Sequence, residues 1–176
     1  MATRRQAREW ALQFLVQQDL NPEPHLDSAL EAFWNQLREL ERERFEEDDR
    51  TELVLNFESQ DEQKVKAFEE ARAFAEERVR GVMLERDALD ARIEPRLKNW
   101  SLYRLGTVER NVLRLGFWEL ENCPEIPTPI VINEHVDLAK FFSETKSGRF
   151  VNGILDRYAK SLKSKSAQDG ETFTPQ

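Results

Sequence analysis

The chain has 176 residues, enough for one ordinary domain with a substantial hydrophobic core. Its six glycines and seven prolines are few for a turn-rich protein, which favours helices over a β-rich fold. No apolar run approaches the roughly 20 residues that span a bilayer, and the N-terminus lacks the apolar segment of a secretory signal, so we expect a cytoplasmic protein. The single cysteine, Cys123, excludes an internal disulfide and a cysteine-based zinc site.

The formal net charge of −8 argues against a generic nucleic-acid-binding protein, which usually carries a basic surplus. The charge is unevenly distributed, however. Residues 1–22 carry +1 and residues 140–176 carry +3, whereas residues 23–99 carry −9 and residues 100–139 carry −3. Because salt screens charges beyond about 8–10 Å at physiological ionic strength, the local sign matters more than the total. The composition therefore permits RNA binding at the two ends only.

The first predicted helix has Thr3 as its N-cap and ends at the proline-containing segment 21–24. Its apolar residues recur at helical spacing and are Ala7, Trp10, Ala11, Phe14 and Leu15. Arg4, Arg5 and Arg8 fall within an arc of about 100° beside this apolar stripe. These arginines either contact RNA phosphates at the edge of a groove or only solvate the helix and pair with acidic side chains.

A second helix is predicted from Asp27 or Ser28, and its inner face is formed by Leu30, Phe33, Trp34, Leu37 and Leu40. The charge-dense segment 38–52 either continues this helix into solvent or forms a disordered linker, and we favour a helix for its first half. Helical spacing resumes at Asp61 and extends to a break near Pro95.

A central helix is predicted from Thr107, as its N-cap, to about Glu121. Apolar residues occupy most of its circumference, which is typical of a helix that lies inside the fold. Only Glu109, Arg110 and Arg114 are then expected at its edge.

Two more helices complete the predicted fold. The first begins with Thr128 as N-cap and Pro129 at the first helical position. The last follows the polar connection 143–148, and its Phe150 either packs in the core or stacks on an RNA base. We expect residues 165–176 to form a disordered tail. The chain is therefore predicted to be all-α, with about seven helices.

Nothing in the sequence supports an enzyme or a bound cofactor. The two histidines, His25 and His135, are too few and too far apart to indicate a metal cluster. Side chains of the neighbours Glu134 and His135 point about 100° apart on a helix, so we interpret them as a surface pair and not as an acid–base dyad. The sequence contains no phosphate-binding glycine loop and no nucleophile elbow. We attribute the pair Asn152–Gly153 to a close approach between helices, and Gly81 is either tolerated or allows close packing.

Four motifs stand out: RRQARE at 4–9, VERNVLRL at 108–115, INEHVDLAK at 132–140 and RFVNGILD at 149–156. Their order and spacing resemble the NusB family of bacterial transcription antitermination factors, over about residues 4–20 and 79–160. The resemblance implies an all-α fold of two packed three-helix subdomains and a further helix. We expect one such domain over residues 1–164, with an acidic insertion around 38–60.

The resemblance also implies a function. Proteins of this family bind boxA-type single-stranded RNA together with the ribosomal protein NusE, within an antitermination complex on RNA polymerase that supports ribosomal RNA transcription. By position in the motifs, Glu109 resembles a residue that faces NusE. The implied RNA-binding residues are Arg4, Arg5, Arg8, Lys146, Arg149 and Phe150. No cofactor is implied, and the free protein is either a monomer or a homodimer.

Two departures from the family pattern support an alternative. Val16 stands where an aromatic residue is common, which removes a possible platform for base stacking, and the middle of the chain is unusually acidic. The alternative is a protein-interaction module of the same fold that has lost RNA binding. A third interpretation, the RNA-binding appendage of an RNA methyltransferase, is disfavoured because the sequence shows no methyl-donor site.

Overall fold

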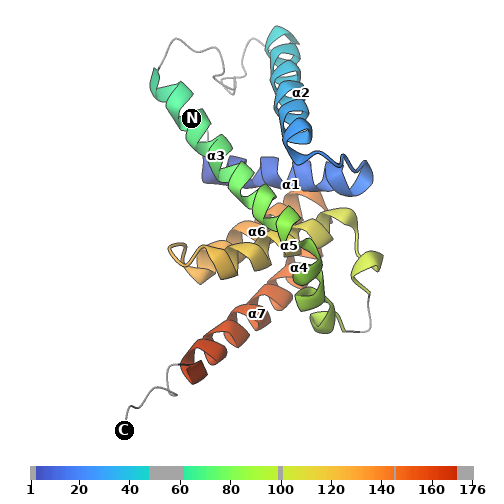
Figure 1. The fold of residues 1–176 in the computed structure, drawn as a ribbon, viewed down its shortest axis with the longest axis vertical. Helices are drawn as coiled ribbons and strands as arrows, with labels where there is room; N and C mark the ends of the chain where they lie inside the picture. The colour runs from blue at the N-terminus through green and yellow to red at the C-terminus, as the bar shows by residue number, and fades with distance from the viewer. Residues whose placement is uncertain (1–2, 48–61, 99–100, 145, 170–176) are drawn as a thin grey trace. The chain divides into compact units, whose positions relative to one another are not determined.

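The computed structural model describes residues 3–47, 62–98, 101–144 and 146–169, with side chains for all of these except 41–47 and 165–169. This part of the chain contains seven α-helices and no β-strand, so the predicted all-α class is confirmed. The chain divides into two compact units, residues 1–80 and 81–176, and the division falls inside α3 (Glu62–Leu84) (Figure 1). None of the described helices is both long enough and apolar enough to cross a bilayer.

Two expected features fall partly outside the described residues. The acidic insertion around 38–60 includes residues 48–60, which lie outside them, whereas α2 (Leu26–Glu47) extends through the first half of the charge-dense segment. The expected tail includes residues 170–176, which also lie outside them, and α7 (Ser147–Asp169) continues five residues beyond Ser164.

The first unit contains α1 (Arg4–Leu20), α2 and most of α3. The predicted cap is confirmed, because the Thr3 hydroxyl accepts a hydrogen bond from the Gln6 amide at 3.2 Å. The apolar stripe of α1 is buried, together with Leu30, Phe33 and Trp34 of α2. Leu40 lines a small groove with Phe33 and Leu37, the residues of its predicted face, but its side chain is 48% exposed. Helical periodicity indicates which face a residue shares, but not how far along the helix that face is covered.

An aromatic cluster fills the core of this unit. The Trp10 and Trp34 rings lie 5.5 Å apart at 87°, and the Phe14 and Phe33 rings lie 5.5 Å apart at 89°. Phe68 of α3 packs on Trp10 at 5.6 Å. Edge-to-face pairs of this kind add about 0.5–1.5 kcal/mol each beyond the burial of their area. The cluster therefore joins all three helices of the first unit.

The second unit is built around α5 (Thr107–Asn122), which packs against the helices α4 (Arg86–Ile93), α6 (Thr128–Phe142) and α7. Two short 3-10 turns, η2 (Glu94–Arg96) and η3 (Leu102–Arg104), connect α4 to α5. Val112, Leu113, Leu115 and Phe117 of α5 are fully buried, as expected for a central helix.

The predicted N-caps of α5 and α6 are each displaced by one residue. Gly106 caps α5 and Pro127 caps α6, so Thr107 and Thr128 are the first helical residues. Neither Gly106 nor Pro127 makes a side-chain capping hydrogen bond. The usual preference for threonine at an N-cap therefore predicted that each helix begins one residue too late.

Arg114 was expected at the edge of α5 but is only 1% exposed. Its guanidinium makes a bidentate ion pair with Asp90 of α4, with both nitrogen–oxygen distances at 2.7 Å. A third hydrogen bond goes to the Asn111 side-chain oxygen at 3.1 Å. Such a pair is tolerated in a core because every buried charge is matched by a partner.

The close helix approaches occur at glycines other than Gly153. A Cβ atom at Gly81 would lie 2.1 Å from the Trp118 indole, and one at Gly116 would lie 2.8 Å from Leu155 Cδ2. At Gly153 the nearest atom would be 3.9 Å away, so that prediction is wrong. Close packing at Gly81, one of the two alternatives, is confirmed.

His135 was expected in a surface pair but is fully buried. Its Nδ1 atom lies 2.7 Å from the Val131 carbonyl oxygen, one helical turn earlier. The interpretation as a surface pair is therefore wrong, because α6 turns this side chain into the core of the second unit.

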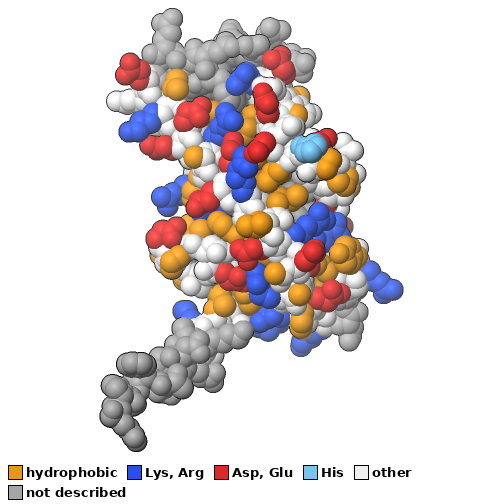
Figure 2. All heavy atoms as spheres, viewed as in Figure 1, with side chains coloured by type: hydrophobic (Ala, Val, Ile, Leu, Met, Phe, Trp, Pro, Cys, Tyr) orange, Lys and Arg blue, Asp and Glu red, His pale blue; other side chains and the backbone are white. Residues whose placement is uncertain are grey.

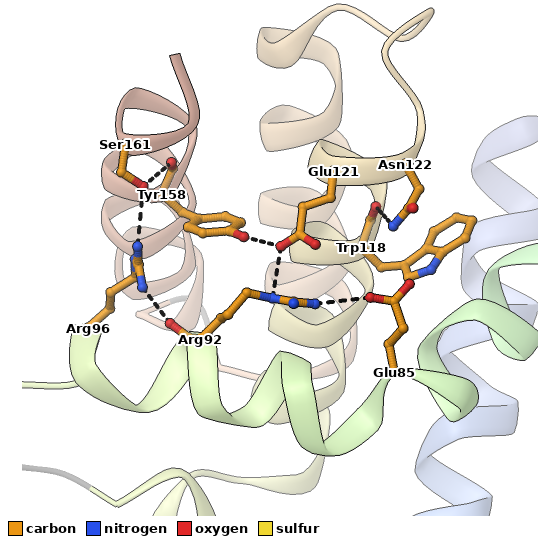
Figure 3. Close-up of polar contacts among 8 residues, drawn as sticks. All are labelled: Glu85, Arg92, Arg96, Trp118, Glu121, Asn122, Tyr158 and Ser161. Carbon is orange, nitrogen blue, oxygen red and sulfur yellow. Dashed lines mark hydrogen bonds and ion pairs between the residues drawn. The ribbon is translucent and has the colours of Figure 1, made fainter. Parts of the chain in front are cut away.

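A polar network links α4, α5 and α7 (Figure 3). Arg92 contacts Glu121 at 3.0 Å and Glu85 at 3.1 Å, and the Tyr158 hydroxyl donates a short hydrogen bond to Glu121. The Tyr158 ring also stacks on Phe117 at 3.9 Å. Burial, followed by the bond to Glu121, raises the pKa of Tyr158 well above its ordinary value.

Candidate nucleic-acid interface

Three arginines predicted to bind RNA lie on the first two turns of α1. Arg4 and Arg5 are exposed, whereas Arg8 is only 3% exposed. The Arg5 Nε atom contacts Glu9 at 3.4 Å, one helical turn away, and the Arg5 side chain remains 47% exposed. An exposed pair of this kind contributes about 0–1 kcal/mol, so a phosphate can displace the glutamate at small cost.

Three guanidinium groups of the first unit lie near the Phe74 ring of α3. The guanidinium carbons of Arg4, Arg8 and Arg78 lie 5.6, 5.2 and 3.1 Å from the ring centroid. Arg78 also donates to the Phe74 carbonyl at 3.0 Å and to Glu77 at 3.1 Å. Cations bind the face of an aromatic ring, and the Glu77 carboxylate offsets one of the three positive charges.

Phe74 and Arg78 were not among the predicted site residues. Their spacing of four residues places them on one face of a helix, which the sequence does indicate. The contacts of Phe74 with the arginines of α1 join residues about 70 positions apart in the chain. These contacts can be seen only in the folded unit.

The remaining predicted RNA-binding residues lie where α7 begins. Lys146 and Arg149 are exposed, and Phe150 is half-buried. A half-buried aromatic ring is compatible with both alternatives for Phe150, because part of it is buried in the unit and the rest is exposed to solvent.

Glu109, the predicted partner-binding residue, lies at the same corner of the second unit. Its Oε1 atom accepts a short hydrogen bond from Ser143 and one from Ser147 at 2.6 Å. The two serine hydroxyls lie 3.2 Å apart. Burial raises the pKa of Glu109, but the serine and backbone hydrogen bonds outweigh it, and the net pKa lies below the ordinary value.

The structure thus joins some predicted site residues within each unit. Arg4 and Arg8 share the Phe74 ring, while Arg5 pairs with Glu9. Glu109 is linked by two serines to the connection that carries Lys146. On the face drawn in Figure 2, basic and acidic side chains are interspersed among hydrophobic ones, so anion binding depends on local clusters.

A separate groove of about 690 Å³ opens beside the network of Figure 3. Its lining combines apolar residues such as Leu120, Ile126 and Leu162 with Arg92 and Glu121, and it includes none of the predicted site residues. Among the described residues, no three His, Cys, Asp or Glu side chains are grouped as metal ligands.

Comparison with known sequences identifies relatives along nearly the whole chain. The profile of the NusB family matches residues 50–160. The transcription antitermination protein NusB of Myxococcus xanthus is 38% identical over 162 residues, covering 92% of this chain and 98% of the relative. The corresponding protein of Geotalea uraniireducens is 37% identical over 165 residues, covering 94% and 99%.

Solved structures show the same similarity. NusB of T. maritima superposes with a TM-score of 0.65 at 32% identity, covering 91% of this chain and 92% of the other. A chain from the crystal structure of antitermination factors NusB and NusE in complex with dsRNA superposes with a TM-score of 0.64 at 30% identity, covering 90% and 96%. The family profile spans more than half of the chain and these relatives match it nearly end to end, so the chain belongs to the NusB family of transcription antitermination proteins.

Proposed function

We propose that this protein is an antitermination factor that binds boxA-type single-stranded RNA together with NusE and so supports ribosomal RNA transcription. Family membership supports the antitermination role. The similar chain from a complex of NusB, NusE and dsRNA supports NusE and RNA as the classes of partner. The observation that carries the proposal for this chain is the placement of Arg4 and Arg8 of α1, with Arg78 of α3, around the Phe74 ring.

The proposed RNA surface has two parts. Arg4 and Arg5, which are exposed, bind phosphates, while Arg8 holds its charge beneath them on Phe74. At the start of α7, Lys146 and Arg149 add phosphate contacts, and the open part of Phe150 stacks on a base. Each part belongs to one of the two basic ends of an otherwise acidic chain.

The remaining proposals concern partners and setting. Glu109 faces NusE, and this protein and NusE act together in the cytoplasm within the antitermination complex on RNA polymerase. The role of this protein there is binding and not catalysis. In the absence of RNA and NusE, a homodimer would mask the arginines, and sedimentation with and without RNA distinguishes this state from a monomer.

Salt-dependent RNA binding tests the proposal. The affinity of the protein with NusE for boxA-type RNA should fall steeply with salt, with a logarithmic slope of about −0.7 for each phosphate neutralised. Substituting Arg4→Ala and Arg5→Ala should make the slope shallower by about 1.4 if each arginine neutralises one phosphate. The control removes the same charge at Lys64 and Lys66, two exposed residues of α3. Equal slopes for the arginine variant and the control would remove α1 from the RNA site.

The alternative, a protein-interaction module without RNA binding, predicts a different result. It is favoured by Val16 and by the net charge of −8. In that case NusE would bind the wild-type protein, yet the joint complex would show no affinity for boxA-type RNA at low salt.

A further inference from the structure

Three helix ends of the second unit meet at the carboxylate of Glu109. Glu109 lies in the first turn of α5, Ser143 caps the C-terminus of α6, and Ser147 begins α7. Both serine hydroxyls bond to the same carboxylate oxygen and approach each other at 3.2 Å. We call these three residues the serine clamp.

The surroundings of the serine clamp leave little space for adjustment. A Cβ atom at Gly106 would lie 2.3 Å from the Glu109 Oε2 atom, and one at Gly148 would lie 2.8 Å from Lys140 Cγ. Backbone bonds fix the same corner, because the Ser143 amide donates to the Ala139 carbonyl at 3.1 Å. A charged carboxylate also makes hydrogen bonds about twice as strong as neutral groups do. The corner is therefore held in one arrangement from both sides.

The serine clamp surrounds the position of a predicted RNA-binding residue. Lys146 lies between Ser143 and Ser147 in the chain, and Arg149 follows Ser147 by two residues on α7. The clamp therefore sets where α7 begins and how its first turn is rotated. That rotation decides which way the side chains of Arg149 and Phe150 project.

We propose that Glu109 is a positioning residue for RNA binding, which acts through Ser143 and Ser147 to hold Lys146, Arg149 and Phe150 in the arrangement that binds RNA. The inference rests on the proposed function. Without the serine clamp, the binding arrangement is only one of several, and the apparent dissociation constant rises as the fraction in that arrangement falls.

The test removes the two hydroxyl groups and no charge. In full-length protein, Ser143→Ala with Ser147→Ala should weaken binding of boxA-type RNA about five- to tenfold, as expected if about 10–20% of molecules keep the binding arrangement. The salt slope should stay that of the wild type, because the molecules that bind still neutralise the same phosphates. A merely structural role of the serines would instead weaken binding equally whether or not Lys146 and Arg149 are present. The matched control is Ser28→Ala with Ser164→Ala, two exposed serines.

A double-mutant cycle separates the clamp from the rest of the site. In a protein that already carries Lys146→Ala and Arg149→Ala, the two serine substitutions should weaken RNA binding by less than twofold, well below their effect in the wild type. If the double serine variant does not fold, each single serine variant should show an intermediate loss of affinity.

The outcomes distinguish the two proposals. If the wild-type protein with NusE binds no RNA, the proposed function fails and the inference fails with it. If the wild type binds RNA and the serine variants match its affinity, or lose as much affinity in the Lys146→Ala and Arg149→Ala background as in the wild type, only the positioning role of Glu109 is overturned.

Discussion

The buried ion pair between Arg114 and Asp90 gives a sharp prediction about stability. We expect Arg114→Met to unfold the second unit far more easily, because methionine fills much of the arginine volume but leaves the Asp90 carboxylate buried without its bidentate partner. Removing one member of a buried pair costs about 3–5 kcal/mol of unfolding free energy. Asn111 also loses a donor, which adds to the cost.

Replacing both charges should restore most of that stability. Apolar side chains of similar volume often match or exceed a buried ion pair, so Asp90→Leu combined with Arg114→Met should lie within about 1–2 kcal/mol of the wild type. The residual cost reflects the Asn111 side-chain oxygen, which still lacks the arginine donor. The non-additivity of the two substitutions is the signature of a direct pair.

Urea unfolding followed by circular dichroism measures these differences. With a slope of about 1–3 kcal/mol per molar urea, the loss for Arg114→Met corresponds to a midpoint lower by at least about 1 M. Arg157→Met, at an exposed position of α7, is the control and should stay within about 0.5 kcal/mol of the wild type. A single Arg114→Met variant within about 1 kcal/mol of the wild type would refute the assignment of a buried, mutually dependent pair.

Two further predictions concern packing and pH. Alanine is about 1 kcal/mol more favourable than glycine in a helix. Gly81→Ala should nevertheless lower the thermal midpoint of unfolding, because its Cβ atom would lie 2.1 Å from the Trp118 indole. An unchanged or higher midpoint would contradict this close approach. The lowered pKa of Glu109 means that its stabilising contribution is present above the ordinary value of 4.5 and is lost as the pH falls through the folded-state pKa. The thermal midpoint of the wild type should therefore exceed that of Glu109→Gln at about pH 6, and the difference should shrink by about pH 3; a difference that is constant with pH would argue against the serine clamp.

The sequence alone determined the secondary structure class and the faces of most helices. The stripe of α1 and the apolar circumference of α5 follow from a rotation of 100° per residue, which depends only on spacing along the chain. The capping role of Thr3 was equally local, because donor and acceptor lie three residues apart. The family resemblance also came from ordered motifs and was confirmed by the relatives.

Only the tertiary structure decided which polar residues are buried and what they contact. From the sequence, Arg114 was predicted at the edge of its helix and His135 on the surface, but both are buried. Periodicity cannot show whether a polar side chain will be buried with a hydrogen-bonding partner. Arg8 and Phe74, or Glu109 and its two serines, lie far apart in the chain, and their contacts depend on how helices pack. Spacing fixes directions within one helix, whereas a site between helices depends on the distances that close packing sets.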